Sequence, residues 1–150
     1  MMESMPSDSV RSEWDTLRGS LIINDKIVFS KDSDLLTSLD TLCCTRLSPI
    51  AARALVTFAL HPFEVIRREN LLRMLWGDHG FVVTSNSLNQ TVCKLREHFR
   101  SIYPDHDLIK TIPRLGYSFV GSVRSDPRSV EQLITLFGGA NANASITMVG

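Results

Sequence analysis

Apolar residues near the start of the chain form short runs that are separated by polar, turn-forming residues. The runs lie at residues 21–23, 27–29, 35–36 and 42–44. Four such runs in succession predict a small antiparallel sheet of four strands. The residues before them, 1–19, include few large apolar side chains and are predicted to form a flexible leader.

The middle of the chain changes to apolar residues at helical spacing. Ser48-Pro49 has the form of an N-cap followed by a first helical residue, and it predicts a helix over about 49–60. A second helix is predicted over 68–76, with Gly77 as the left-handed residue that ends it. The connection between these two helices is short.

A third helix is predicted over about 84–100, because a cluster of capping residues at 84–87 precedes a long helical pattern. The apolar residues of this helix fall on one narrow face and predict its contact with the core. They are Leu88, Val92, Leu95 and Phe99. The side chains predicted to point away are Asn86, Gln90, Cys93, Lys94 and Glu97, with Asn89 and Arg96 on the flanks.

The last third of the chain begins with a predicted β-hairpin. Residues 108–112 and 117–120 alternate apolar and polar side chains on either side of a Pro113–Gly116 turn. The fold class is therefore α+β: a four-stranded antiparallel sheet, three helices and a hairpin within residues 20–124. These elements form one predicted domain.

A further helix is expected beyond the hairpin. Asp126-Pro127 is predicted to start it, and Val130, Leu133, Ile134 and Phe137 fall on one face. Self-packing or dimerisation is the favoured use of this face, and a partner groove or the run-up to a membrane segment are the alternatives. Residues 140–150 are expected to be disordered, so 125–150 is predicted to be a helix followed by a tail.

Composition narrows the class of protein. The 150 residues, 43% apolar and 21% charged, suit one globular domain. No run of 18 apolar residues predicts a membrane span, and the N-terminus does not resemble a signal peptide. Three cysteines, two of them adjacent, favour a reducing, cytoplasmic compartment. Membrane tethering is expected only if the chain is a fragment of a longer protein.

The charges are balanced in total but separated along the chain. There are 16 basic and 16 acidic residues, yet residues 67–124 carry nine basic and five acidic side chains. A local positive excess is typical of a surface that binds a polyanion. It lies on the stretch that contains the third helix and the hairpin.

The polar face of the third helix carries side chains suited to DNA. Asn and Gln amides can pair with adenine in a major groove, whereas Lys94, Arg96 and Arg100 can neutralise phosphates. Lys110 and Arg114 lie on or beside the hairpin turn, where a wing would reach a neighbouring groove. A solvated helix face and an ordinary surface hairpin are the alternatives.

The order of elements and several motifs resemble the winged helix-turn-helix domain of the OmpR/PhoB family over about 20–123. The matching segments are Leu47-Ser48-Pro49, Val65 through Gly77, Lys94-Leu95-Arg96, and Ile109 through Tyr117. The segment 82–90 and the Thr111-Ile112-Pro113-Arg114 wing are most similar to the ToxR/CadC one-component regulators. Members of that branch typically continue into a membrane span and a periplasmic sensor.

The resemblance implies a bacterial, sequence-specific transcription regulator with its third helix in the major groove of double-stranded promoter DNA. The residues implied to lie nearest the bases are Asn86, Asn89, Gln90, Cys93 and Lys94. Those implied to contact the backbone or the minor groove are Trp76, Thr84, Arg96, Arg100, Lys110, Thr111, Arg114 and Tyr117. The loop at 77–83 corresponds to a segment that touches RNA polymerase in some members, and a homodimer on DNA is expected.

Three residues depart from the family pattern. Arg67 stands where a capping Ser or Thr is common, which predicts a weaker start of the second helix. Glu97 replaces a common basic residue and places a carboxylate near phosphate. Cys93 replaces a common Arg or polar residue.

No enzymatic or metal chemistry is expected. The cysteines and histidines lack the spacing of a zinc module, and no nucleophile or phosphate-loop motif occurs, so neither cofactor nor small-molecule substrate is predicted. The main alternative to a DNA-binding regulator is a winged-helix interaction adaptor that has lost DNA binding. Zero net charge and Glu97 favour that alternative, whereas the polar amide face with Lys94, Arg96 and Arg114 favours DNA.

Overall fold

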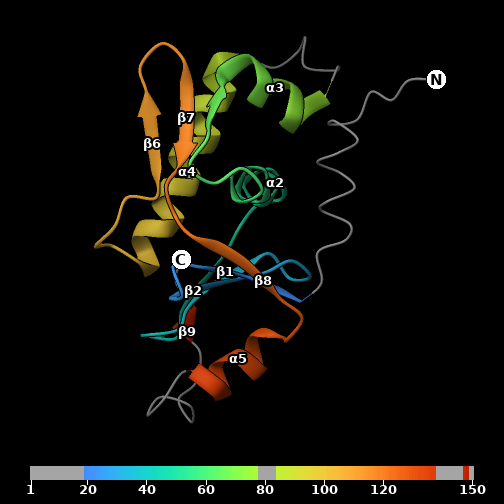
Figure 1. The fold of residues 1–150 in the computed structure, drawn as a ribbon, viewed down its shortest axis with the longest axis vertical. Helices are drawn as coiled ribbons and strands as arrows, with labels where there is room; N and C mark the ends of the chain where they lie inside the picture. The colour runs from blue at the N-terminus through green and yellow to red at the C-terminus, as the bar shows by residue number, and fades with distance from the viewer. Residues whose placement is uncertain (1–18, 78–83, 138–146, 149–150) are drawn as a thin grey trace, which may run out of the picture.

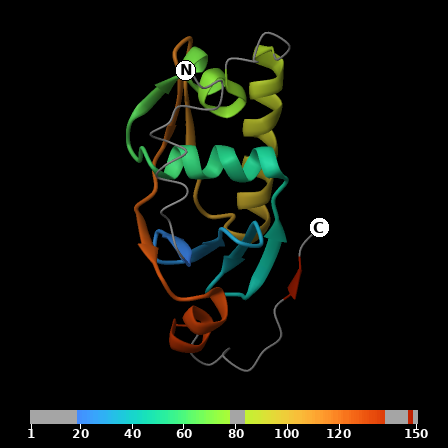
Figure 2. The same ribbon diagram turned by 90° about the vertical axis from the view of Figure 1, so that its right-hand side faces the viewer.

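The structure is a computed structural model that describes residues 19–77, 84–137 and 147–148. The predicted leader, the predicted polymerase-contacting loop apart from Gly77, and most of the predicted tail lie outside the described residues. The described elements form layers (Figures 1 and 2). Helix α2 (Pro49–Ala59) lies above an N-terminal sheet, helix α3 (Arg68–Trp76) and a small second sheet lie above α2, and helix α5 (Val130–Phe137) lies below the N-terminal sheet.

The N-terminal sheet contains the four predicted antiparallel strands. They are β1 (Ser20–Ile23), β2 (Ile27–Ser30), β3 (Leu35–Ser38) and β4 (Cys43–Arg46). Asn24 and Asp25 form the first turn with positive φ angles of 52° and 57°, a conformation that Asn and Asp tolerate well. The predicted meander is therefore confirmed.

Two further strands extend this sheet and were not predicted. Strand β8 (Val123–Asp126) pairs antiparallel with β1, and β9 (Thr147–Met148) pairs parallel with β4, giving the order β8-β1-β2-β3-β4-β9. Residues 123–126 reach β1 because the hairpin returns the chain to the first strand. Alternating apolar and polar residues do not mark this segment, since Arg124 and Ser125 are both exposed.

Helices α2 (Pro49–Ala59), α3 (Arg68–Trp76) and α4 (Ser85–Ile102) match the three predicted helices within two residues. Ser48 caps α2 by accepting a hydrogen bond from the Ala51 amide, and Thr84 caps α4 by accepting one from Ser87. Arg67 provides no side-chain cap for α3, as its residue type predicts. The Arg68 amide instead donates to the Leu115 carbonyl at 2.9 Å.

Gly77 ends α3 at a positive φ of 70°, which glycine adopts without steric cost. Its ψ of −162° lies outside the left-handed helical region, so the predicted left-handed cap geometry is wrong in detail. The predicted helix boundary is still correct. The Gly77 amide donates to the Arg73 carbonyl and closes the last turn.

The apolar face of α4 packs in the main core, as predicted. Leu88, Val92, Leu95 and Phe99 are at most 2% exposed. They share one cluster with α2 and with the side chains of the N-terminal sheet that face α2, including Phe29. This burial fixes which face of α4 is left for solvent.

The predicted hairpin consists of β6 (Ile109–Ile112) and β7 (Gly116–Phe119). A third strand, β5 (Val65–Arg67), lies in the connection between α2 and α3 and pairs with β7. Gly116 permits this pairing, because a Cβ there would lie 2.0 Å from the Ile66 carbonyl oxygen. We call this three-stranded sheet the wing.

Helix α5 (Val130–Phe137) packs on the face of the N-terminal sheet opposite to α2 (Figure 1). Leu133 and Ile134 form a second core with Ile22 and Val28. The predicted start of α5 at Asp126-Pro127 is wrong. Asp126 ends β8, and the helix begins three residues after Pro127 because Ser129 and Gln132 form a reciprocal capping box.

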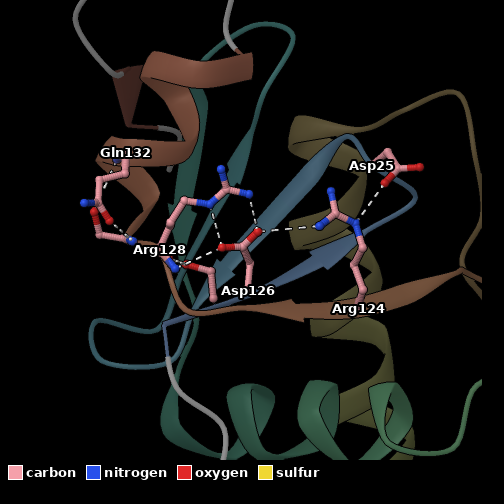
Figure 3. A network of polar contacts seen from close by, with 7 residues as sticks. Asp25, Arg124, Asp126, Arg128 and Gln132 are labelled. Carbon is pink, nitrogen blue, oxygen red and sulfur yellow. Dashed lines mark hydrogen bonds and ion pairs between the residues drawn. The ribbon is translucent and has the colours of Figure 1, made fainter.

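Asp126 instead anchors the corner between β8 and α5 (Figure 3). Arg128 donates from Nε to Asp126 Oδ1 at 2.8 Å, and Arg124 lies 3.6 Å from Oδ2 and also contacts Asp25. The hydrogen bonds from the Arg128 side chain and amide, with the charges of both arginines, hold the pKa of Asp126 well below its usual value. The side chain of Asp126 is buried, so these bonds satisfy it where water cannot.

Candidate nucleic-acid interface

The outward face of α4 carries the polar side chains predicted to point away from the core. Asn86, Gln90, Cys93, Lys94 and Glu97 are all exposed. The buried apolar residues of the same helix alternate with them along the sequence and fix the orientation of the helix. We call this surface the α4 outer face.

Glu97 moderates the charge of the α4 outer face. Its carboxylate lies 3.8 Å from Lys94 Nζ, and the Cys93 thiol lies 3.9 Å from Glu97 Oε2. Both charged partners are more than half exposed, so the ion pair contributes little to stability. Its effect is on the local field, since it partly offsets the positive charge of Lys94.

A polar cluster joins α3, α4 and the wing, and we call it the Arg68 cluster. Arg68 Nη2 donates to Asn89 Oδ1 at 2.7 Å, and the Tyr117 hydroxyl donates to the same oxygen at 3.1 Å. Arg68 Nη1 lies 3.2 Å from the Tyr117 hydroxyl, and Nη2 also reaches the Ser85 carbonyl. Arg68 was not among the predicted site residues, because its position in sequence indicates only the start of a helix.

Arg96 holds the wing against α4. Its guanidinium donates to the Ile109 carbonyl at 2.8 Å and to Thr111 Oγ1 at 2.8 Å. It lies 5.8 Å from the centre of the Tyr117 ring, and Arg68 lies 5.7 Å from that centre, so the ring contacts two cations. Arg96 and Thr111 are thus hydrogen-bonded to each other, and Tyr117 is hydrogen-bonded to Asn89 and only 5% exposed. Their predicted contacts with the DNA backbone stay predictions.

The remaining predicted residues lie at both ends of this surface. Trp76 is half-buried and lines a hollow of about 510 Å³ with Gln90 and Lys94, beside the first turn of α2. Lys110 and Arg114 are exposed on the wing, where Arg114 occupies the hairpin turn at a φ of 67°. Arg100 is exposed near the end of α4. At a rise of 1.5 Å per residue, Arg100 lies about 21 Å along the helix axis from Asn86. The two side chains would therefore have to contact different parts of a DNA site.

His98 joins α4 to the N-terminal sheet. Its Nδ1 lies 2.9 Å from Thr45 Oγ1 on β4, and its side chain is half-buried. Burial, followed by the positive charge of Lys94, lowers the pKa of His98. Among the described residues no group of three or more His, Cys, Asp or Glu side chains is placed to hold a metal ion.

A family model described as "Transcriptional regulatory protein, C terminal" matches residues 44–119, half of the chain. The chain belongs to this family. The match includes α2, α3, α4 and the wing, so every residue of the α4 outer face lies within it. This assignment confirms the predicted OmpR/PhoB-type winged helix, a DNA-binding domain of transcription regulators.

Two relatives are similar to this chain over part of their length. The chain is 32% identical over 92 residues to a cholera toxin homolog transcriptional activator of Vibrio parahaemolyticus, covering 57% of the chain and 32% of that protein. It is 30% identical over 105 residues to the cholera toxin transcriptional activator of Vibrio cholerae, covering 69% of the chain and 36% of that protein. The chain therefore spans about a third of the length of these relatives.

Solved structures agree on the fold of this family domain. The DNA-binding domain of Escherichia coli CadC superposes with a TM-score of 0.64 at 21% identity, over 74% of this chain and all of that one. The DNA-binding domain of the response regulator AdeR, solved in complex with an intercistronic region, gives a TM-score of 0.53 at 14% identity, over 63% and 94%. At these identities the likeness shows the fold alone.

None of the described helices combines the length and the apolar character that a membrane span requires. The longest of them, α4, owes its 18 residues to one buried face and one polar face. Helix α5 is more apolar but has eight residues.

Proposed function

We propose that this chain is the sequence-specific reading domain of a transcription regulator, with α4 in the major groove of promoter DNA and the wing on the adjacent backbone and minor groove. The observation that carries the proposal is the α4 outer face. Its exposed amides and Lys94 stand on a helix whose opposite face is fully buried, next to exposed Lys110 and Arg114. A helix of this width fits a major groove, and amides and cations are the groups that contact bases and phosphates there.

Within this proposal, Asn86, Asn89, Gln90, Cys93 and Lys94 face the bases. Thr84, Trp76, Arg100, Lys110 and Arg114 lie where they can contact the backbone or the minor groove. Arg96, Thr111 and Tyr117 contribute by holding the wing, in addition to any contact with phosphate. The role is regulatory and not enzymatic.

The proposal extends to partners. Head-to-head or tandem pairs of half-sites are the usual targets of winged helices, so a homodimer on DNA is included. RNA polymerase is proposed as a partner of the 77–83 loop, by resemblance to other family members. A cytoplasmic, nucleoid-associated location follows if these partners are correct.

The test is fluorescence anisotropy of the chain with promoter fragments at two salt concentrations, using wild type and the Lys94→Ala/Arg114→Ala double variant. We expect the affinity of the double variant to be lower by about tenfold or more. The salt dependence should fall by about one unit of log slope for each phosphate that the variant no longer neutralises. Lys26→Ala is the matched control, because Lys26 is exposed but lies in the turn between β1 and β2 of the N-terminal sheet, paired with Asp40. Its affinity should equal that of wild type.

One observation favours a second candidate function, that of an interaction adaptor. The pairing of Glu97 with Lys94 lowers the positive charge of the α4 outer face, and the whole chain is neutral. The same experiment separates the two functions. If wild-type chain shows no binding at low salt, the adaptor is favoured and the DNA-reading proposal fails.

A further inference from the structure

The amide of Asn89 is not free to pair with a base as an ordinary asparagine would. Its Oδ1 accepts hydrogen bonds from Arg68 Nη2 at 2.7 Å and from the Tyr117 hydroxyl at 3.1 Å. An amide oxygen has two lone pairs, so both are in use. Asn89 is nevertheless exposed on the flank of the α4 outer face.

The identity of the bonded atom follows from the chemistry of its partner. A guanidinium can only donate, so the amide atom 2.7 Å from Arg68 has to be the oxygen. The amide nitrogen is the other arm of the same planar group and takes part in neither bond. The part of Asn89 that is left for DNA is therefore an –NH₂ group with two donors and no acceptor.

Adenine recognition by asparagine needs both arms of the amide. The oxygen accepts from adenine N6 and the nitrogen donates to N7. With the oxygen occupied, adenine N6 meets no acceptor. Guanine presents two acceptors, N7 and O6, at the same edge, and cytosine presents a donor, N4, that would oppose the –NH₂ group.

We propose that Arg68 and Tyr117 fix Asn89 as a donor-only reader, so that α4 selects guanine rather than adenine at the base this residue meets. The inference rests on the proposed function and names the specificity of one position within it. Arg68 and Tyr117 act as positioning residues, because they reach the base only through Asn89. Tyr117 is itself held by the two guanidiniums beside its ring, so the direction of its hydroxyl is set by α3 and α4 together.

Gln90 provides the internal comparison. It is the next residue on α4 and is also exposed, but its side chain makes no hydrogen bond to any part of the described chain. Within the part of the chain that the structure describes, both arms of its amide are therefore available. Two neighbouring amides on one helix thus differ in what they can offer to a base.

The experiment is selection of binding sites from a randomised double-stranded DNA library by wild-type chain and by Asn89→Asp. Aspartate keeps an oxygen for Arg68 and Tyr117 and replaces the –NH₂ group by a second acceptor, so the cluster is retained and only the outward chemistry is inverted. We expect one position of the selected motif to change from G·C to C·G, because the new carboxylate accepts from cytosine N4. The expected change in preference at that position is about tenfold, the order of discrimination that one good base contact provides.

Two further variants distinguish position-specific effects from charge and from folding. Asn70→Asp makes the same change of amide to carboxylate at an exposed position on α3, where the Asn70 oxygen accepts from Arg73 at 3.2 Å, and it should leave that position of the motif unchanged. Arg68→Gln removes the guanidinium and frees one of the two lone pairs of the oxygen, so adenine should become tolerated at the same position while circular dichroism reports a folded chain. If Arg68→Gln does not fold, Tyr117→Phe removes the second donor and should shift the preference towards adenine to a smaller degree.

The inference is overturned if Asn89→Asp selects the wild-type motif, or if the position that it alters is an A·T pair in wild type. An unchanged motif for Arg68→Gln in a folded chain overturns the positioning role. If wild-type chain selects no motif at all, the proposed function itself fails, and that outcome is recognised before any variant is compared.

Discussion

The two ends of the domain are stabilised in different ways. The N-terminal sheet is buried on both faces, with α2 and α4 on one side and α5 on the other, and its contacts are mainly apolar. The wing also packs into the core through Ile109 and Phe119, but it has in addition a set of hydrogen bonds to α3 and α4 that is centred on Arg68 and Arg96. Apolar packing holds the sheet end, whereas directional hydrogen bonds are added at the wing end.

This difference teaches how a small domain can present a stiff reading surface. Apolar packing is not directional and tolerates substitution of similar volume, so it is suited to holding the sheet and helices together. Hydrogen bonds from a guanidinium have fixed geometry and therefore set the angle between α4 and the wing. Variants at the two ends should affect different properties.

The largest expected effect comes from Leu95→Ala, which removes a fully buried side chain below the α4 outer face. We expect the free energy of unfolding to fall by about 2–5 kcal/mol, because apolar burial is reduced and a cavity is left behind. Urea denaturation followed by circular dichroism measures it. A near-neutral result would show that the buried and exposed faces of α4 are exchanged.

Leu133→Ala tests the other core, below the sheet. Leu133 is also fully buried, but it lies on a short terminal helix that can adjust, so we expect a decrease near the lower end of the range, about 2–3 kcal/mol. DNA affinity of the folded chain should be unchanged, since α5 lies across the sheet from α4. Leu136→Ala is the control, because Leu136 is 56% exposed on the same helix and should change stability by less than about 0.5 kcal/mol.

Arg96→Ala tests the hydrogen bonds that join α4 to the wing. It removes the bonds to the Ile109 carbonyl and Thr111, and we expect the free energy of unfolding to fall by about 1–2 kcal/mol, with faster hydrogen exchange in β6 and β7. Arg100→Ala, at an exposed position one turn further along α4, should be neutral in both measurements. Equal exchange in wild type and Arg96→Ala would mean that the wing keeps its position without this guanidinium.

A smaller effect is a pH dependence of stability at the contact between α4 and β4. The pKa of His98 is lowered in the folded state from an ordinary value of 6.5. Just below pH 6.5 the imidazole is therefore protonated to a greater extent in the unfolded chain than in the folded chain. The free energy of unfolding should therefore decrease as pH falls below about 6.5 and level off once the folded state is also protonated. The difference should disappear in His98→Asn, measured by urea denaturation at pH 7.5 and 5.5.

Asp126 provides the opposite case at the sheet end. Its pKa is lowered by Arg128 and Arg124, and an acid with a lowered pKa stabilises the fold above the unfolded value of 3.8. That contribution should disappear as pH falls below about 3.8, well separated from the His98 range. Asp126→Asn should remove this acid-dependent step and leave the His98 step in place.

Local signals were sufficient to predict much of the fold. Turn residues and runs of apolar side chains defined β1 to β4, and capping residues placed the three helices within two residues of their bounds. Strands β5, β8 and β9 were missed because they are short and depend on pairing with segments far away in sequence, which local patterns do not encode. The same limit explains the wrong start of α5, where Asp126 was expected to cap a helix but pairs with two arginines.

Prediction of the site had a similar limit. Helical spacing identified the exposed polar residues of α4, since one buried face determines the other. It did not identify Arg68, and it assigned Asn89 an ordinary amide chemistry, because hydrogen bonds between α3, α4 and the wing exist only in the folded arrangement. Spacing also placed Arg96 among DNA contacts without showing that its guanidinium already binds the wing.

The position of β1 has a consequence for how the chain reaches this structure. Its Ser20 pairs on one side with Ser30 and on the other with Asp126. During synthesis from the ribosome, one edge of β1 can close within ten residues, whereas the other edge waits for more than a hundred. Such distant pairing forms slowly and leaves an unpaired strand edge in the meantime. The arrival of β8 is therefore expected to be a late step of folding, and a nascent chain that stalls before it should be prone to aggregate.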